Sequence, residues 1–208
     1  MSLGYFTVAD KIENTIVIER SKFICNIKNV VDEADARSFI EEIRKKHSLA
    51  NHNCYAYIAD DKGLIQKFSD DGEPQGTAGL PMLEVLKSKK MYKTVAVVTR
   101  YFGGIKLGTG GLTRAYGGSV SEGLSIAKVN EMLPSTIFEL RPDYETYSKL
   151  VKHLVCSDIK VIKTEFANDV QVVFAIKSNC AERFIEKITD YFNGKLVFNK
   201  IKEEFFAF

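Results

Sequence analysis

Alternating apolar and polar positions predict several β-strands in the first half of the chain. Residues 15–19 and 22–28 follow this two-residue period, which is typical of strands with one buried face, and residues 54–59 are predicted to form another strand. Residues 94–101 contain four consecutive apolar positions, Val95 to Val98. We therefore expect this last strand to be buried on both faces.

Helical periodicity is clearest between Asp32 and Lys46. Asp32 is placed to cap the helix, and apolar residues recur every three to four positions behind it. A second helix is predicted after Pro81. A third is predicted from Leu112, where apolar residues again recur at helical spacing. The buried stripe of the first helix is predicted to consist of Ala36, Phe39, Ile40 and Ile43.

The last third of the chain predicts the element order βαββαβ, that of a ferredoxin-like split βαβ sandwich. This region carries no motif of its own. Asn193-Gly194 follows the second helix and is typical of a left-handed cap. The predicted strands are residues 135–140, 159–166, 170–177 and 196–206, and the predicted helices run over residues 144–156 and from residue 179.

Composition divides the chain into two predicted domains. Thirteen of the 14 glycines lie at or before Gly123. From Pro134 onwards 11 basic residues meet 11 acidic ones, so the net charge of +2 belongs to the residues before it. Such a shift predicts a boundary around residues 131–134, with domains at 1–133 and 134–208.

The composition excludes disorder and membrane insertion as the basis of the fold. Hydrophobic residues make up 45% and charged residues 27%, as in soluble globular chains. We find neither an apolar run of about 18–20 residues nor the features of a signal peptide. The four cysteines lack the paired spacing of a structural zinc site, and buried reduced thiols predict a cytoplasmic protein.

Residues 69–81 contain three carboxylates in four positions, at Asp70, Asp71 and Glu73. Aspartate, glycine and proline all favour turns, so a solvated turn is one interpretation. A calcium loop would need alternating oxygen ligands and a closing glutamate, which this segment lacks. We expect Asp71 and Glu73 to order the loop, and one of them to pair with Arg100 or Arg114. We expect no metal here.

Residues 99–118 predict a buried strand, a glycine-rich loop and a helix start, an arrangement that directs free backbone N–H groups at an anion. The segment lacks the lysine of a P-loop, and Thr113 breaks the dinucleotide fingerprint. For the loop glycines, close packing and anion binding remain equally open. Inside the helix, Gly117, Gly118 and Gly123 are expected to let it lie close to a sheet.

Charge favours the anion interpretation. Between Lys87 and Lys128 there are eight basic residues and one acidic residue, Glu122. A basic, glycine-lined surface suits a phosphodiester backbone or polyphosphate, although a solubilising face would have the same composition. The predicted phosphate-binding residues are Arg100, Lys106, Thr109, Gly110, Gly111 and Arg114.

Signatures of catalysis are sparse, and we assign no catalytic residue. His52 precedes a strand and is more often structural than a base. A dyad of His52 with Cys54 stays open, because residues two apart share one face of a strand. An apolar strand environment would raise the thiol pKa and argues against reactivity.

Three motifs in order resemble the YigZ/IMPACT family: His52–Tyr57, Asp70–Gly79 and Arg100–Tyr116. The resemblance implies an α+β protein. Its N-terminal domain would be a ribosomal-protein-domain-2-like or elongation-factor-domain-IV-like α/β sandwich, and its C-terminal ferredoxin-like domain would be elongation-factor-domain-V-like. Eukaryotic relatives regulate translation by competing for a partner of a stress kinase. For bacterial members the resemblance implies nucleic-acid or ribosome binding.

We therefore expect a cytoplasmic regulator of translation that binds RNA or the ribosome through the basic glycine-rich surface. One alternative is an enzyme acting on a phosphorylated small molecule or nucleotide, because small-molecule kinases share the fold implied for the N-terminal domain. Another is a regulator that binds a protein partner. No cofactor is expected, and the oligomeric state is left open.

Overall fold

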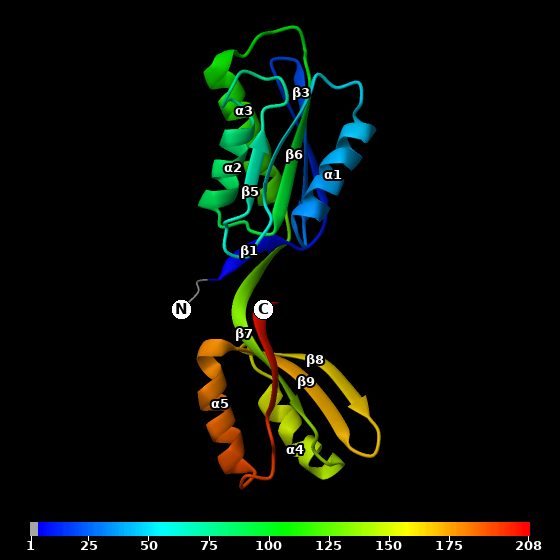
Figure 1. Cartoon of the computed structure of the whole chain (residues 1–208), viewed down its shortest axis with the longest axis vertical. Helices are drawn as coiled ribbons and strands as arrows, with labels where there is room; N and C mark the ends of the chain where they lie inside the picture. The colour runs from blue at the N-terminus through cyan, green and yellow to red at the C-terminus, as the bar shows by residue number, and fades with distance from the viewer. Residues whose placement is uncertain (1–3) are drawn as a thin grey trace. The chain divides into compact units, whose positions relative to one another are not determined.

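The structure, a computed structural model, describes residues 4–208 and has a mixed α+β fold (Figure 1). It divides into two compact units, Tyr5–Asn130 and Gly4 with Glu131–Phe208. The predicted boundary lies three residues further along. Pro134, expected to mark that boundary, lies inside strand β7 (Val129–Leu140), opposite Phe205.

The N-terminal unit is built on one sheet in the order β2-β3-β6-β4-β5, in which neighbouring strands are antiparallel. The central strand β6 therefore lies between β3 and β4. The predicted strands are present with shifted ends, whereas β1 and β5 were not predicted. The strands of this unit are β1 (Tyr5–Val8), β2 (Ile12–Ile18), β3 (Ser21–Asn29), β4 (His52–Ile58), β5 (Gln66–Ser69) and β6 (Thr94–Tyr101).

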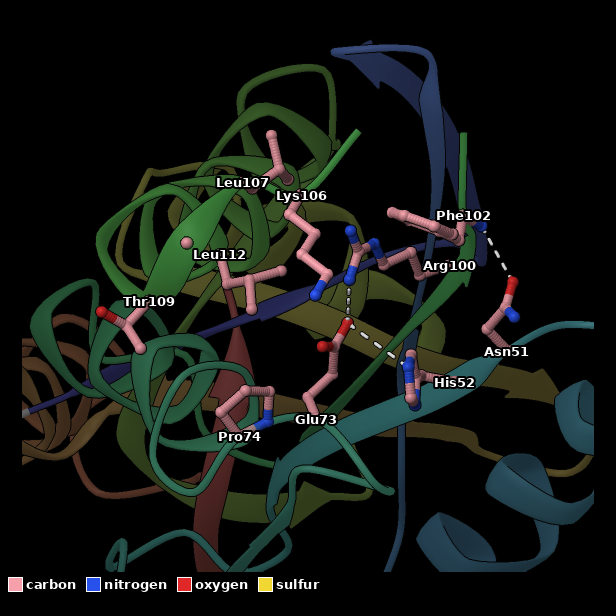
Figure 2. Close-up of a pocket in the computed structure, with 11 residues that line it drawn as sticks. Asn51, His52, Glu73, Pro74, Arg100, Phe102, Lys106, Leu107, Thr109 and Leu112 are labelled. Carbon is pink, nitrogen blue, oxygen red and sulfur yellow. Dashed lines mark hydrogen bonds and ion pairs between the residues drawn. The ribbon is translucent and has the colours of Figure 1, made fainter. Parts of the chain in front are cut away.

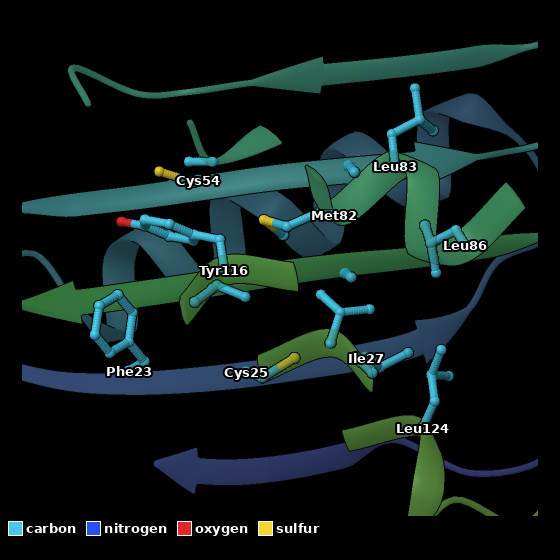
Figure 3. Packing of buried hydrophobic residues seen from close by; sticks show 14 of the residues in the cluster. Phe23, Cys25, Ile27, Cys54, Met82, Leu83, Leu86, Tyr116 and Leu124 are labelled. Carbon is cyan, nitrogen blue, oxygen red and sulfur yellow. The ribbon is translucent and has the colours of Figure 1, made fainter. Parts of the chain in front are cut away.

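Helices cover both faces of this sheet (Figure 1). Helix α1 (Glu33–Lys46) packs on the face that carries Val95 and Val97. Helices α2 (Gly79–Ser88) and α3 (Gly108–Ser125) pack on the face that carries Ala96 and Val98. Strand β6 is thus buried on both sides, as its apolar run predicted. The larger core includes Phe23, Cys25, Ile27, Met82, Leu86, Tyr116 and Leu124 (Figure 3).

Helix α1 begins as the sequence predicted. The Asp32 carboxylate accepts a hydrogen bond of 2.8 Å from the Asp35 backbone N–H, which satisfies one of the free donors at the helix start. Acidic residues lie in the first turn and basic residues in the last, in the orientation that the helix dipole favours. The buried residues are Ala36, Phe39, Ile40 and Ile43, the predicted stripe.

Helix α2 begins at Gly79, two residues before Pro81, so its predicted start is wrong. Proline is tolerated at the third helical position because the first four N–H groups have no partner inside a helix. A Cβ on Gly79 would lie 2.8 Å from the Ser69 backbone nitrogen and oxygen. The close approach of the two chain segments therefore requires glycine here.

Helix α3 begins at Gly108, so the predicted loop at Gly108–Gly111 is the first helical turn instead. The expectation of close packing holds for Gly123, where a Cβ would lie 3.0 Å from Ile27 Cδ1. It is wrong for Gly118, because a Cβ there would meet no atom of residues 4–208 within 4 Å apart from its own helical neighbours. Gly117 has ordinary packing distances of 3.8 Å to α2.

The C-terminal unit has the element order β7-α4-β8-β9-α5-β10. Its antiparallel strands lie in the order β10-β7-β9-β8, and Phe138, Leu150, Phe174 and Ile188 belong to its own core. Asn193 and Gly194 have positive φ after α5, as expected of a cap. The remaining elements are α4 (Tyr144–Leu154), β8 (Ile159–Phe166), β9 (Val170–Lys177), α5 (Ser178–Tyr191) and β10 (Asn199–Ala207).

Helices long and apolar enough to cross a membrane are absent from the described part of the chain.

Candidate functional site

A pocket of about 450 Å³ lies where four segments of the N-terminal unit meet (Figure 2). These are the start of β4, the loop between β5 and α2, the end of β6 and the start of α3. Register explains part of the meeting, because His52 of β4 pairs directly with Arg100 of β6. The lining residues are Asn51, His52, Glu73, Pro74, Arg100, Phe102, Lys106, Leu107, Gly108, Thr109 and Leu112.

A buried ion pair forms one wall of the pocket. Glu73 Oε1 lies 2.7 Å from Arg100 Nη1 and accepts a second hydrogen bond of 2.7 Å from the Tyr116 hydroxyl. The side chains of Arg100 and Glu73 are 6% and 3% exposed. Burial, followed by the neighbouring Cys54 and Glu73, raises the pKa of Tyr116 far above its usual value, so this hydroxyl stays protonated and donates.

Arg100 was expected to flank a phosphate on a basic, glycine-lined surface, and the structure shows its side chain buried in the pocket wall. Its guanidinium is packed between the rings of Phe23 and Phe102, each with its centroid 5.4 Å from Cζ. Nε has no hydrogen-bond partner among residues 4–208. Arg100 is therefore a component of the pocket wall, and its free donor is unusual for a buried polar group.

The tautomer of His52 follows from its partner. Nδ1 lies 2.9 Å from the Asp71 carbonyl oxygen, which can only accept, so Nδ1 carries the hydrogen in the neutral ring. Nε2 is then an acceptor, 3.9 Å from Glu73 Oε1. The ring is held on the pocket wall with this nitrogen on the Glu73 side.

Asp71 orders the loop between β5 and α2. Its Oδ2 accepts from the Asn53 backbone N–H at 2.7 Å, and its Oδ1 pairs with Arg44 Nη2 at 3.1 Å. The residue has a positive φ of 43°, and Gly72 follows at 89°. Glu73, rather than Asp71, pairs with an arginine of the predicted site.

The candidate dyad of His52 with Cys54 is not formed. The buried Cys54 thiol donates to the Asp70 carbonyl oxygen over 2.9 Å. Burial is the largest cause that raises the Cys54 pKa, and the nearby carboxylates raise it further. A thiol with a raised pKa is a poor nucleophile at neutral pH.

The start of α3 forms the opposite side of the pocket. Lys106 points into the pocket, and Gly108 and Thr109 line it (Figure 2). The capping residue, Leu107, makes no side-chain cap bond within the described chain, and the first turn contains no acidic residue. The free N–H groups and positive dipole end of this helix are therefore available to an anion.

The structure brings part of the predicted site together. Arg100, Lys106 and Thr109 line the pocket, while Gly110 and Gly111 belong to the same first turn of α3. Arg114 is exposed and does not line the pocket. Its guanidinium is close to the first turn of α3, since Nη1 lies 3.7 Å from the position that a Cβ on Gly110 would take. Of the predicted loop-ordering residues, Asp71 lies beside the pocket and Glu73 lies in its wall.

The expected basic surface is divided. Lys87, Lys89, Lys90 and Lys93 lie between the end of α2 and the start of β6, whereas Arg100 lies at its far end. Thr94, at the start of β6, and Arg100 are six residues apart, which corresponds to roughly 20 Å along a strand. These lysines therefore do not add to the charge at the start of α3.

Several pocket residues were missed by the sequence interpretation, namely Asn51, Pro74, Phe102, Leu107 and Leu112. His52 was noticed and interpreted as structural. A signal for four of them existed, because Pro74, Phe102, Leu107 and Leu112 fall inside the motifs that carry the family resemblance. Within residues 4–208, no group of three or more His, Cys, Asp or Glu side chains could hold a metal ion.

Comparisons with known proteins agree on one family. The model of the Impact N-terminal domain matches residues 19–124. IMPACT family member YvyE of Bacillus subtilis (strain 168) is 46% identical over 192 residues, which cover 92% of this chain and 88% of that protein. IMPACT family member YigZ of Escherichia coli (strain K12) is 36% identical over 189 residues, which cover 89% of this chain and 92% of that protein.

More distant comparisons differ in extent. Protein IMPACT-A of Xenopus tropicalis is 34% identical over 99 residues, which cover 45% of this chain and 30% of that protein. A solved structure described as a hypothetical protein matches with a TM-score of 0.62 and 33% identity. It covers 98% of this chain and 100% of its own.

Proposed function

This chain belongs to the IMPACT family, and from that premise we propose that it is a cytoplasmic regulator of translation that binds RNA, on the ribosome. The family resemblance supplies the link with translation. The observation that carries RNA binding is the uncapped start of α3, with Lys106 and Arg114 beside it. Backbone N–H groups and cations together are the donors that phosphate oxygens accept.

The finer fold assignments belong to the same proposal. The N-terminal unit would correspond to the ribosomal-protein-domain-2-like sandwich and to domain IV of the elongation factor. The C-terminal unit would be the ferredoxin-like counterpart of domain V, which its strand order β10-β7-β9-β8 supports. This likeness to two domains of the translocating elongation factor is the reason why we propose binding on the ribosome.

Co-sedimentation with purified ribosomes across a salt series tests this function. We expect binding at low salt and release at high salt, because phosphate contacts release counterions. A Lys106→Ala/Arg114→Ala variant should bind more weakly and reduce the salt slope by about 1 to 2. The control is Lys89→Ala/Lys128→Ala, which removes the same charge from exposed positions elsewhere. Equal binding by wild type and both variants would contradict the proposal.

A further inference from the structure

The pocket beside the first turn of α3 has a volume and a charge that an open RNA-binding surface does not need. We infer that it is a phosphomonoester site, which takes the terminal phosphate of a nucleotide or of an RNA end rather than an internal phosphodiester. This inference rests on the proposed function and narrows it: the surface would recognise a phosphate terminus.

Charge decides between the two kinds of phosphate. Glu73 compensates Arg100 within the wall, so the uncompensated positive charge comes from Lys106 and the end of α3. A lysine and a helix N-terminus amount to about +1.5. A monoester carries about −1.5 to −2 at neutral pH, whereas each internal phosphodiester carries a single negative charge. The pocket matches the monoester.

The buried guanidinium is a second observation that points to a ligand. Arg100 lines the pocket, its side chain is 6% exposed, and its Nε lacks a partner among residues 4–208. Buried donors of this kind are normally paired. Because Nε is itself covered from solvent, a ligand oxygen on this wall, opposite the N–H groups of α3, would reach it only with a shift of the side chains packed on the guanidinium.

Volume and apolar surface leave room for more than a phosphate. The volume of about 450 Å³ lies within the range of small-ligand pockets, roughly 300–1,000 Å³. Pro74, Leu107 and Leu112 supply apolar walls. Phe102 is 45% exposed and offers a ring on which a base can stack. A nucleoside can therefore accompany the phosphate.

Calorimetric titration of the full chain tests the inference with three probes that share one nucleoside. These are adenosine 5′-monophosphate, the diester 3′,5′-cyclic adenosine monophosphate, and adenosine. We expect the monophosphate to bind at least about tenfold more tightly than the other two. A second arm compares one RNA decamer with a 5′-phosphate and with a 5′-hydroxyl. If neither arm shows a preference for the monoester, the inference is overturned.

Two variants locate the binding. Thr109→Asp places a carboxylate in the first turn of α3, where the helix dipole favours it, so the chain should stay folded while monophosphate binding falls at least about tenfold. Thr109→Asn, of nearly the same shape, should retain binding. Lys106→Ala should weaken binding and Lys89→Ala should not. Unchanged binding in both Thr109→Asp and Lys106→Ala overturns the pocket as the site.

The two proposals fail separately. Monophosphate binding without ribosome co-sedimentation would keep the phosphomonoester site and contradict the proposed function. Ribosome co-sedimentation without any preference for a monoester would support the proposed function and overturn the phosphomonoester site. Arg114→Ala adds a check: Arg114 lies outside the pocket lining, so it should affect ribosome binding more than monophosphate binding.

Discussion

Glu73 organises the candidate site at the level of single residues. One of its oxygens accepts from Arg100 and from Tyr116, which come from β6 and α3. The carboxylate thereby joins the loop before α2 to the two elements that build the other walls. Such a pair is costly to break, because the remaining charge stays buried without its partner.

Replacing Arg100 tests this pair. Arg100→Leu removes the guanidinium and leaves the buried Glu73 carboxylate uncompensated, so we expect the free energy of unfolding to fall by about 3 to 5 kcal/mol. Urea denaturation followed by circular dichroism measures the change. Lys163→Leu breaks an exposed pair with Glu165 and should change stability far less. Similar losses in both variants would show that the buried pair has no special role.

The titration of His47 gives a second prediction. Burial, with Lys46 as the next cause, lowers the pKa of His47 below its usual 6.5. The unfolded chain therefore takes up a proton at a higher pH than the folded chain, and this residue's contribution to stability is lost as pH falls below about 6.5. NMR titration of the ring should give a value under 6.5. A value of 6.5 or above would contradict the burial argument.

For single residues, the sequence predicted which side chains pair with one another better than it predicted how buried those side chains are. Pairing of a loop carboxylate with an arginine was expected, and Glu73 with Arg100 is such a pair. Arg100 was nevertheless expected on a basic surface, because this part of the chain has an excess of basic residues. Its burial depends on the strand register that places it opposite His52, and the pattern along one strand does not contain that register.

Helix α2 shows how an element is stabilised from outside itself. Its capping residue, Ala78, has no side chain to cap with. Instead the Asp70 carboxylate accepts from the backbone N–H groups of Gly76, Ala78 and Gly79 at 2.8 to 3.0 Å. The acidic loop is thus an N-terminal cap supplied from eight residues upstream.

Removal of this cap should weaken the N-terminal unit. Asp70→Ala leaves three backbone donors without their acceptor, and we expect a loss of about 2 to 3 kcal/mol, measured by urea denaturation. Asp32→Ala removes the single cap bond of α1 and serves as the comparison, with an expected loss of about 1 kcal/mol. An equal or larger loss in Asp32→Ala would contradict the role of Asp70.

Two glycines near α3 should respond to alanine in opposite directions. A Cβ on Gly103 would lie 2.1 Å from the Arg20 backbone, so Gly103→Ala should destabilise the unit by more than 1 kcal/mol. Gly118 lies inside the helix with open space around it, so Gly118→Ala should stabilise by about 0.5 to 1 kcal/mol. Thermal midpoints measure both changes, and shifts of the same sign would refute this assignment.

The start of α3 was the element that the sequence predicted least well. Three glycines in its first turn, Gly108, Gly110 and Gly111, oppose helix formation, so a loop was the natural expectation there. The helix forms because Leu112, Ala115 and Tyr116 are buried against the sheet, and packing outweighs local preference. The predicted consequence, free N–H groups beside cations, is present at a helix start instead of in a loop.

At the scale of the whole molecule, each unit has a hydrophobic core of its own, and we expect the units to unfold separately. Phe174→Ala, at a fully buried position of the C-terminal core, should cost about 3 to 5 kcal/mol. Hydrogen exchange should then accelerate across residues 131–208 and stay unchanged in β6. Acceleration of both regions together would show one cooperative unit.

Periodicity predicted the βαββαβ order of the C-terminal unit, because its strands and helices have regular patterns and short connections. In the N-terminal unit it did not predict β5, whose residues are mostly exposed. The order in which the strands of a sheet lie depends on contacts distant in sequence, and the sequence did not predict it for this unit.

The position of β6 has a consequence for how the chain is made. Strands β3 and β4 each pair with β6 and are separated by it. Synthesis from the N-terminus therefore delivers two hairpins, β2–β3 and β4–β5, before the strand that joins them. A nascent chain stalled before Thr94 would present two unpaired strand edges, which invite mispairing, and the sheet closes once residues up to Tyr101 have emerged.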